Sequence, residues 1–323
     1  MHGVFLDIAT VDRGDLDLEP VRSALDQWTA YPETTREEIR QRIGNADIVI
    51  SNKTRLGSHD LRSAEKLKLV CIAATGTNNV DLDTAQALDI TVCNVTAYAT
   101  ASVVEHVFSM LLILVRRLDA YREAVHAGRW QQAGEFCLLD YPIRELAGMT
   151  LGIIGYGELG QAVATMGKAF GMRILIAERA DNLPRPGRMA LDEVLKTADI
   201  ISLHCPLNRE TRHLIGPREL GLMQCGALLV NTARGGIVDE QALLHSLQSG
   251  DIAGAAIDVL SEEPPQHGSP LLDTGLPNLL VTPHIAWASV KSRQRLINQV
   301  ADNITAWQAG NPRNVISSQT ARD

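Results

Sequence analysis

The stretch TLGIIGYGELG, residues 150–160, decides the fold, because in it an apolar run of strand length leads directly into closely spaced glycines. Gly155, Gly157 and Gly160 follow the pattern GxGxxG, and a helical pattern opens at Glu158. In such a turn the first glycine permits the tight bend, the second lets the backbone approach a pyrophosphate, and the third lets helix and strand pack closely. The free N–H groups at the start of the helix would face the phosphates. The stretch therefore predicts a dinucleotide-binding unit.

An acidic residue stands where such a unit binds the adenosine ribose. Glu178 ends the next predicted strand, 23 positions after Gly155. A carboxylate there can accept hydrogen bonds from both ribose hydroxyls and repels a 2′-phosphate, so it favours NAD over NADP. Arg179 beside it could pair with such a phosphate, which keeps NADP as the second choice.

Short apolar runs alternate with helical patterns along most of the chain, which indicates parallel sheets covered by helices. The predicted strands of the first series span 3–9, 47–52, 67–74 and 90–95, and a long helix follows over about 100–127. The predicted strands of the second series span 151–155, 173–178, 199–206, 227–233, 253–259 and 279–284. An amphipathic helix over about 287–309 follows and can cross back onto the first domain.

These elements predict an α/β protein with two Rossmann-like domains, each built on a parallel sheet. A dinucleotide-binding domain, 99–287, is expected to be inserted into a discontinuous substrate domain made of 1–98 and 288–323.

The composition excludes several classes of function. The chain has 323 residues, a net charge of −8 and a pI near 5.6, which argues against nucleic acid or an anionic membrane as the main partner. The acidic N-terminal stretch is unlike a signal peptide, and the most apolar stretch, 107–115, is too short to span a bilayer. The five cysteines lack metal-ligand spacing, so we expect no metal site and reduced thiols in a cytoplasmic protein.

Three polar residues follow strands of the second series, where open α/β sheets bind their ligands. Arg234 ends LLVNTAR, Glu263 closes AIDVLSEE, and His284 ends LLVTPH. A guanidinium matches a carboxylate with a planar fork, and an imidazole can protonate a carbonyl oxygen as hydride reaches the carbon. A neighbouring carboxylate keeps an imidazole protonated to higher pH. Taken singly, they could be a plain turn, a solvated acidic loop and a packed histidine, but together they favour one catalytic site.

Seven stretches carry a resemblance to a known family over essentially the whole chain. They are TGTNNVDLDTA (75–85), SVVEH (102–106), GIIGYGELG (152–160), HCPLNRETRHLIG (204–216), VNTARGGIVDEQAL (230–243), GAAIDVLSEEP (254–264) and TPHIAWAS (282–289). With them the chain resembles the D-isomer-specific 2-hydroxyacid dehydrogenases. The resemblance implies an NAD-dependent oxidoreductase that acts on the CH–OH group of a short 2-hydroxy acid.

The resemblance also implies roles for individual residues. Arg234 would bind the substrate carboxylate, Glu263 would be the partner carboxylate, and His284 would be the acid–base residue. A loop similar to the one whose N–H groups hold the substrate carboxylate consists of Thr75, Gly76 and Thr77.

Asp258 matches the acid that engages the nicotinamide carboxamide in this family. Besides the glycine turn, Glu178, Arg234 and His284, the positions implied to line the cofactor are those of Glu158, Leu159, Cys205, Thr232, Ala233 and Trp287. Of the other histidines, His204 could line the cofactor cleft, and His106 lies on a helix without an assigned role.

Two departures from the family pattern are informative. Glu178 stands where an Asp is usual, which still allows the ribose contact. The tetrapeptide HIAW, 284–287, stands where many relatives have small residues, and it is similar to glycerate dehydrogenases (hydroxypyruvate reductases). Trp287 would either line the pocket or pack at the domain junction.

We therefore expect reduction of hydroxypyruvate to D-glycerate, in a cleft that closes to exclude water. The resemblance implies a homodimer with the helix near 100–127 at its interface. A relative acting on glyoxylate or on the oxo acid of D-lactate is the first alternative. A dinucleotide-sensing protein like the C-terminal-binding-protein corepressors is the second, although the tail NPRNVISSQTARD offers little for recruiting partners.

Overall fold

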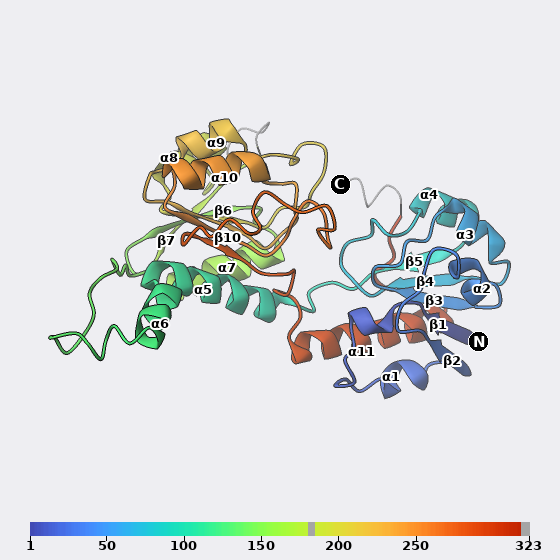
Figure 1. Ribbon diagram of the computed structural model, residues 1–323. Coiled ribbons are helices and arrows are strands. Elements are labelled where there is room, and N and C mark those ends of the chain that lie inside the picture. The colour runs from blue at the N-terminus through green and yellow to red at the C-terminus, as the bar shows by residue number, and fades with distance from the viewer. Residues whose placement is uncertain (180–184, 318–323) are drawn as a thin grey trace. The chain divides into compact units, whose positions relative to one another are not determined.

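The computed structural model describes residues 1–179 and 185–317, and the chain divides into two compact units. Unit 1 comprises Met1–Ala99 and Ala288–Asp323, and unit 2 comprises Thr100–Trp287 (Figure 1). Each unit contains one sheet, and every pairing between two named strands is parallel. The predicted α/β fold with two Rossmann-like sheets is confirmed.

The sheet of unit 1 has five strands in the order β2-β1-β3-β4-β5. Its strands are β1 (His2–Phe5), β2 (Gln27–Ala30), β3 (Ile48–Ser51), β4 (Leu69–Ile72) and β5 (Thr91–Cys93). Its helices are the 3-10 helix η1 (Ile8–Thr10), α1 (Glu19–Arg22), α2 (Ile39–Ile43), α3 (Ser58–Ser63), α4 (Leu82–Ala87) and α11 (Val290–Gln308). The apolar stripe of α11 packs against β4 and α1, so the C-terminal segment completes the unit that the N-terminal segment begins.

The sheet of unit 2 has six strands in the order β11-β10-β9-β8-β6-β7. Its strands are β6 (Thr150–Ile154), β7 (Arg173–Ile176), β8 (Ile200–Leu203), β9 (Leu228–Asn231), β10 (Gly254–Ile257) and β11 (Leu279–Val281). Its helices are α5 (Thr100–Arg116), α6 (Leu118–His126), α7 (Glu158–Ala169), α8 (Leu191–Thr197), α9 (Pro217–Leu222) and α10 (Glu240–Ser249).

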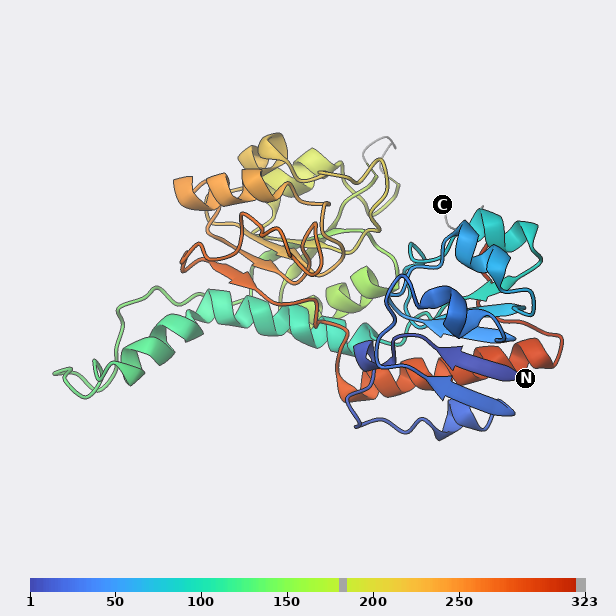
Figure 2. The ribbon, with the colours of Figure 1, turned by 45° about the vertical axis from the view of Figure 1, so that its right-hand side comes forward.

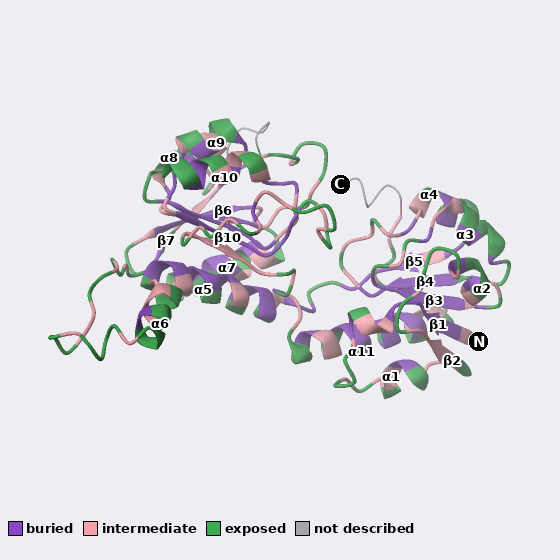
Figure 3. Cartoon of the chain, in the orientation of Figure 1, coloured by how far each residue is buried: buried purple, intermediate pink, exposed green. Residues whose placement is uncertain are grey.

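Helices cover both faces of the sheet of unit 2. Figure 1 shows α8, α9 and α10 on one face and α5 and α7 on the other. The central strands between them are buried along their whole length (Figure 3). A strand buried on both faces can be apolar at every position, which explains continuous runs such as IISL in β8. Among the described residues, no helix has both the length and the apolar character needed to cross a membrane.

Three features differ from the predicted elements. The helix expected over about 100–127 is two helices, because Arg117 has a left-handed backbone with a φ of +54° between α5 and α6. Strand β2 was not predicted, since its four residues, QWTA, are only partly buried at the edge of their sheet. The predicted strands also run too far, as at β8, which ends at Leu203 and leaves His204 in a loop.

The carboxyl edge of the sheet of unit 2 is where the topology places a ligand site. The chain passes from β6 outward to β7 and then returns to β8 on the other side of β6. Open parallel sheets bind ligands beyond the carboxyl ends of their strands at such a reversal. Because the strands are parallel, the residues that follow β6, β8, β9, β10 and β11 all lie at this edge.

Gly152, in the middle of β6, has no room for a larger side chain. A Cβ there would lie 2.7 Å from Cγ1 of Val194 and 2.8 Å from Cδ1 of Ile201. We expect Gly152→Val to lower the free energy of unfolding by about 1–3 kcal/mol, the usual cost of overfilling a packed core. Urea unfolding measures the change, with Gly221→Ala as the control because its added Cβ meets no atom within 4 Å. Wild-type stability in Gly152→Val would contradict the packing described.

Candidate active site

The turn after β6 that contains Gly155, Gly157 and Gly160, the glycine turn, brings two backbone segments close together. Gly155 has a φ of +92°, and a Cβ on it would lie 2.5 Å from the backbone nitrogen of Cys205. A Cβ on Gly160 would lie 2.1 Å from the carbonyl oxygen of Gly155. Both positions therefore require glycine, and Gly155 requires it for its left-handed backbone as well.

The residues around this turn fit a bound dinucleotide. Gly157 precedes α7, and a Cβ on it would meet no atom within 4 Å. No side chain caps the start of α7, so its first N–H groups stay available to an anion. Thr232, directly after β9, has a buried hydroxyl oxygen without a hydrogen-bond partner among the described residues. A ligand along this edge would give that oxygen a partner, with the pyrophosphate at the N-terminus of α7.

The expected cofactor-lining residues that follow β6 and β8 lie around the glycine turn. Glu158 opens α7, where its carboxylate accepts a hydrogen bond from the hydroxyl of Thr100, and Leu159 is partly buried next to it. The backbone of His204 and Cys205, directly after β8, lies against the glycine turn. Burial lowers the pKa of His204 to about 4 and raises that of Cys205 to about 11. Both side chains are therefore neutral near pH 7, and Cys205 is unsuited to act as a nucleophile.

Glu178 has cationic neighbours that the sequence pattern did not reveal. Its buried carboxylate accepts two hydrogen bonds from the guanidinium of Arg185, each 2.7 Å long. The N–H of Arg179 donates to it at 3.0 Å, and Nη1 of Arg188 lies 3.4 Å away. The hydrogen bonds from Arg185 outweigh the opposing effect of burial and hold the pKa of Glu178 well below its usual range. The residue expected to bind the ribose thus already has an ionic partner.

Arg234 follows β9, and the last residue of that strand fixes its backbone. The side-chain amide of Asn231 donates to the carbonyl oxygen of Arg234 at 2.9 Å, and its Oδ1 accepts from the N–H of Ala233 at 3.0 Å. Nη1 of Arg234 donates to the carbonyl oxygen of Ala233 at 2.7 Å. No acidic side chain of the described residues pairs with this guanidinium, so its remaining N–H groups can bind an anion.

Glu263 and His284 form a short hydrogen bond at the same edge. Oε2 of Glu263 and Nδ1 of His284 are 2.6 Å apart, and 34% and 27% of the two side chains are exposed. The other carboxylate oxygen accepts from the N–H of Leu260 at 2.9 Å, which fixes its orientation. The pairing through Nδ1 leaves Nε2 of His284 as the atom that can exchange a proton with a ligand. A Cβ on Gly235 would lie 1.8 Å from the carbonyl oxygen of Leu260, so the loops after β9 and β10 are in contact here.

Asp258, directly after β10, is the buried acid of this edge. Its Oδ1 accepts hydrogen bonds from the hydroxyl of Thr282 at 2.6 Å and the N–H of Ile285 at 2.9 Å, and its Oδ2 accepts from the N–H of Ala286 at 3.0 Å. Its carbonyl oxygen accepts from the N–H of His284 at 2.8 Å. Burial by itself raises the pKa of Asp258, but the imidazole of His106, whose Nε2 lies 3.4 Å from Oδ1, and the hydrogen bonds from Thr282, Ala286 and Ile285 outweigh it and leave the pKa lowered. Asp258 therefore holds the loop that carries His284.

The loop of Thr75, Gly76 and Thr77 belongs to unit 1, where it follows β4. The hydroxyl of Thr75 donates to the carbonyl oxygen of Val95 at 2.9 Å, and Nδ2 of Asn94 donates to the carbonyl oxygen of Thr75 at 2.8 Å. Within residues 1–179 and 185–317, the three N–H groups of this loop donate no hydrogen bond. They are therefore available to an anion such as a carboxylate.

The structure brings the expected residues of unit 2 to one sheet edge and adds others that sequence analysis did not assign. Nε2 of His106, on α5, lies 3.0 Å from Oγ1 of Thr282. In unit 1, Nδ2 of the buried Asn303 donates to the carbonyl oxygen of Asn94 at 2.8 Å and thereby supports the loop at 75–77. An amide or imidazole inside an otherwise apolar helical stripe was the only signal for these residues in the sequence.

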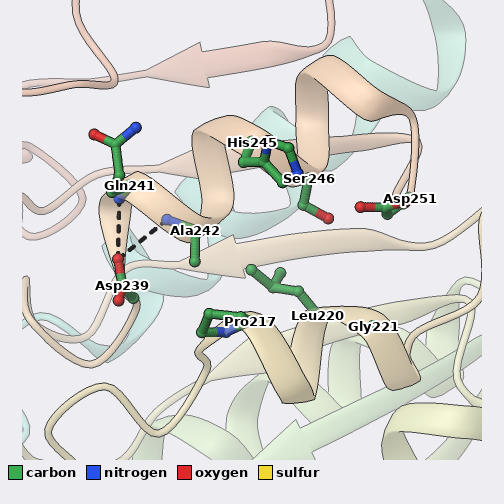
Figure 4. A pocket seen from close by; sticks show the side chains of 9 residues that line it. All are labelled: Pro217, Leu220, Gly221, Asp239, Gln241, Ala242, His245, Ser246 and Asp251. Atoms are coloured by element: carbon green, nitrogen blue, oxygen red, sulfur yellow. Dashed lines mark hydrogen bonds between the residues drawn. The ribbon is translucent and has the colours of Figure 1, made fainter.

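A separate groove lies between α9 and α10 (Figure 4). Polar residues on its lining are Asp239, Gln241, His245, Ser246 and Asp251. Asp239 uses its carboxylate to cap α10, accepting from the N–H groups of Gln241 and Ala242. None of the residues assigned to the candidate site lines this groove.

Comparison with known proteins gives a consistent result. A family model described as D-isomer specific 2-hydroxyacid dehydrogenase, NAD binding domain, matches residues 108–286. The chain is 44% identical over 293 residues to a glycerate dehydrogenase of Methylorubrum extorquens, covering 90% of this chain and 92% of that protein. It is 37% identical over 324 residues to a hydroxypyruvate reductase of Blautia hydrogenotrophica, covering 98% and 100%. A solved acyclic imino acid reductase in complex with NADPH and D-Arg has a TM-score of 0.85 at 28% identity, covering 98% and 100%.

Proposed function

The chain belongs to the D-isomer-specific 2-hydroxyacid dehydrogenases, and we propose that this oxidoreductase interconverts hydroxypyruvate and D-glycerate with a nicotinamide dinucleotide. The observation that carries the chemistry is the 2.6 Å contact between Nδ1 of His284 and Glu263 at the ligand-binding edge. The names of the two relatives support the substrate, since they describe the two directions of one reaction. When bound, the nicotinamide supplies the hydride that reaches the carbonyl carbon.

His284 donates the proton that the carbonyl oxygen needs as it becomes a hydroxyl. Nε2 is the donor, because Nδ1 is taken by Glu263. Glu263 stabilises the protonated imidazole and fixes the plane of the ring. In the oxidation of D-glycerate, Nε2 takes the hydroxyl proton back.

Each unit holds groups that can bind a carboxylate, unit 1 being the proposed substrate domain and unit 2 the proposed dinucleotide domain. Arg234 contributes a guanidinium without an acidic partner among the described residues. The loop at 75–77 contributes three N–H groups. A planar carboxylate suits a guanidinium fork, and it can also accept from backbone N–H groups.

NADH is the preferred cofactor, with Glu178 accepting from the ribose hydroxyls. Arg185 works against this preference, because its guanidinium, now paired with Glu178, could pair with a 2′-phosphate instead. The preference therefore depends on the balance between this carboxylate and this guanidinium.

The enzyme is a homodimer of the cytoplasm. Its five cysteines are free thiols, which fits a reducing compartment. We propose the interface at the end of the helical stretch near 100–127 and in the segment that follows α6, residues 127–145, which extends away from the sheet of unit 2 (Figure 2). It exposes Phe136 and Leu139 at 91% and 74%, together with Trp130 and Ile143. A second copy burying the same patch would cover these side chains symmetrically.

The substrate is tested by a panel of hydroxypyruvate, glyoxylate and pyruvate, each assayed with NADH and with NADPH. We expect the highest kcat/KM for hydroxypyruvate with NADH. A higher kcat/KM for glyoxylate or pyruvate would contradict the proposed substrate and favour an enzyme that acts on that oxo acid. Binding of NADH without turnover of any oxo acid would favour a dinucleotide-sensing protein.

Glu178→Ala tests the cofactor assignment within that panel. The substitution removes both the ribose contact and the repulsion of a 2′-phosphate, and it frees Arg185 to bind that phosphate. We expect the ratio of kcat/KM for NADH to that for NADPH to fall by at least about 10-fold, or roughly 1.4 kcal/mol. Glu193→Ala, on the exposed face of α8, is the control. Equal or better use of NADPH by the wild type would overturn the assignment.

Glu263→Gln tests the pairing with His284 through the rate of reduction. The carboxylate holds the ring of His284 through the 2.6 Å contact with Nδ1, which leaves Nε2 as the proton donor. In Glu263→Gln we expect kcat for hydroxypyruvate reduction to fall by about 10- to 100-fold, while the dissociation constant of NADH stays the same. Glu262→Gln, one residue away and paired with the exposed His267, is the matched control. An unchanged kcat in Glu263→Gln would separate Glu263 from the proton transfer.

The dimer is tested by light scattering on purified protein. We expect the wild type to have twice the chain mass of 35.1 kDa, and the double variant Phe136→Ser, Leu139→Ser to shift toward the single mass. Leu88→Ser, at an exposed apolar position of unit 1, should keep the wild-type mass. A monomeric wild type would rule the dimer out.

A further inference from the structure

The turn that carries His284 has a backbone that needs support from outside. His284 has a φ of +55°, a left-handed conformation that residues with a Cβ rarely adopt. Such a conformation persists only where the surrounding contacts hold it. Asp258 supplies part of the support through hydrogen bonds to Thr282, Ile285 and Ala286. The indole Nε1 of Trp287 adds a hydrogen bond to the carbonyl oxygen of His284 at 3.0 Å.

Helix α5 reaches the same turn with two polar side chains. The buried Ser102 donates from Oγ to the carbonyl oxygen of Ala286 at 2.7 Å. Nε2 of His106 lies 3.0 Å from Oγ1 of Thr282 and 3.4 Å from Oδ1 of Asp258. Ser102 and His106 are four positions apart, so they share one face of α5.

The hydrogen bonds of Thr282 show which ring nitrogen of His106 carries a hydrogen. The single hydroxyl hydrogen of Thr282 goes to the carboxylate of Asp258, which can only accept. Oγ1 of Thr282 must therefore accept from His106, and Nε2 of His106 must carry a hydrogen. The chain of donors runs in one direction, from His106 through Thr282 to Asp258.

We propose that α5 is the support of the His284 turn, with His106 and Ser102 as positioning residues that hold Thr282–Trp287 in place. The expected effect on catalysis rests on the proposed role of His284, whereas the structural support of the turn does not depend on that role. Unit 2 begins at Thr100 and ends at Trp287, so the bond between Ser102 and Ala286 ties together the two ends of this unit. The proton donor is thereby fixed to the longest helix of its unit as well as to the sheet edge.

Hydrogen–deuterium exchange on the full-length protein tests the support directly. The amides of Ile285 and Ala286 are protected by Asp258, whose carboxylate is in turn fixed by the donor chain from His106. We expect His106→Leu to exchange faster than wild type in peptides that contain these amides. His106→Gln should largely restore protection, since its amide can donate to Oγ1 of Thr282. Unchanged exchange in His106→Leu would overturn the inference.

Serine variants of α5 supply a matched pair for the same measurement. Ser102→Ala removes the bond to Ala286 and should accelerate exchange in the turn. Ser109→Ala is the control, because Ser109 lies on the exposed face of α5 and donates only to the carbonyl oxygen of Glu105 in its own helix. Equal exchange in the two variants would remove Ser102 from the support.

Kinetics of the same variants separates positioning from folding. A proton donor displaced by about 1 Å loses up to roughly 100-fold in rate, so His106→Leu should lower kcat for hydroxypyruvate by about 10- to 100-fold. KM for hydroxypyruvate and the dissociation constant of NADH should change little. The double variant His106→Leu, Thr282→Val should be no worse than Thr282→Val, since both break one chain of donors. Faster exchange with unchanged kcat would support the inference and count against the proposed role of His284.

Discussion

The candidate active site of unit 2 depends on the hydrogen bonds that the buried carboxylate of Asp258 accepts. Strand β10 delivers it to the sheet edge, where its oxygens accept from Thr282, Ile285 and Ala286. Those bonds bend the chain after β11 and let His284 keep its left-handed backbone. An uncharged residue at this position would leave buried donors without partners, which is costly in a water-free environment. The orientation of His284 toward Glu263 therefore follows from the fold and does not rest on their mutual contact alone.

Much of the fold could be predicted because the sheets are parallel and buried. Continuous apolar runs such as those of β8 and β10 mark the strands, and the glycine turn at 155–160 marks the first strand of unit 2. The break at Arg117 could not be predicted, because the apolar pattern of the helix continues across it while the backbone turns. Strand β2 could not be predicted for a different reason, because an edge strand of four partly buried residues has too short an apolar pattern to be recognised.

The candidate site was predictable where one strand end decides a residue's position. Arg234 and His284 each follow a strand closely, and the parallel order of the sheet brings them to one edge. The ion pair between Glu178 and Arg185 was not predictable, since it depends on the path of the chain between them. The role of His106 was not predictable either, because it depends on which face of α5 meets the loop after β11. Local patterns thus fix which strands carry the site, whereas long-range packing fixes the partners of each charge.

The central claim is that His284, oriented by Glu263 on a turn held by Asp258, donates the proton during reduction of a 2-oxo acid. Its most direct test is single-turnover reduction of hydroxypyruvate by His284→Ala with bound NADH. The account predicts that NADH binds with unchanged affinity while the rate of its oxidation falls by about 10²- to 10⁴-fold, the usual contribution of a positioned acid. A His284→Ala protein that oxidises NADH at a near wild-type rate would contradict it.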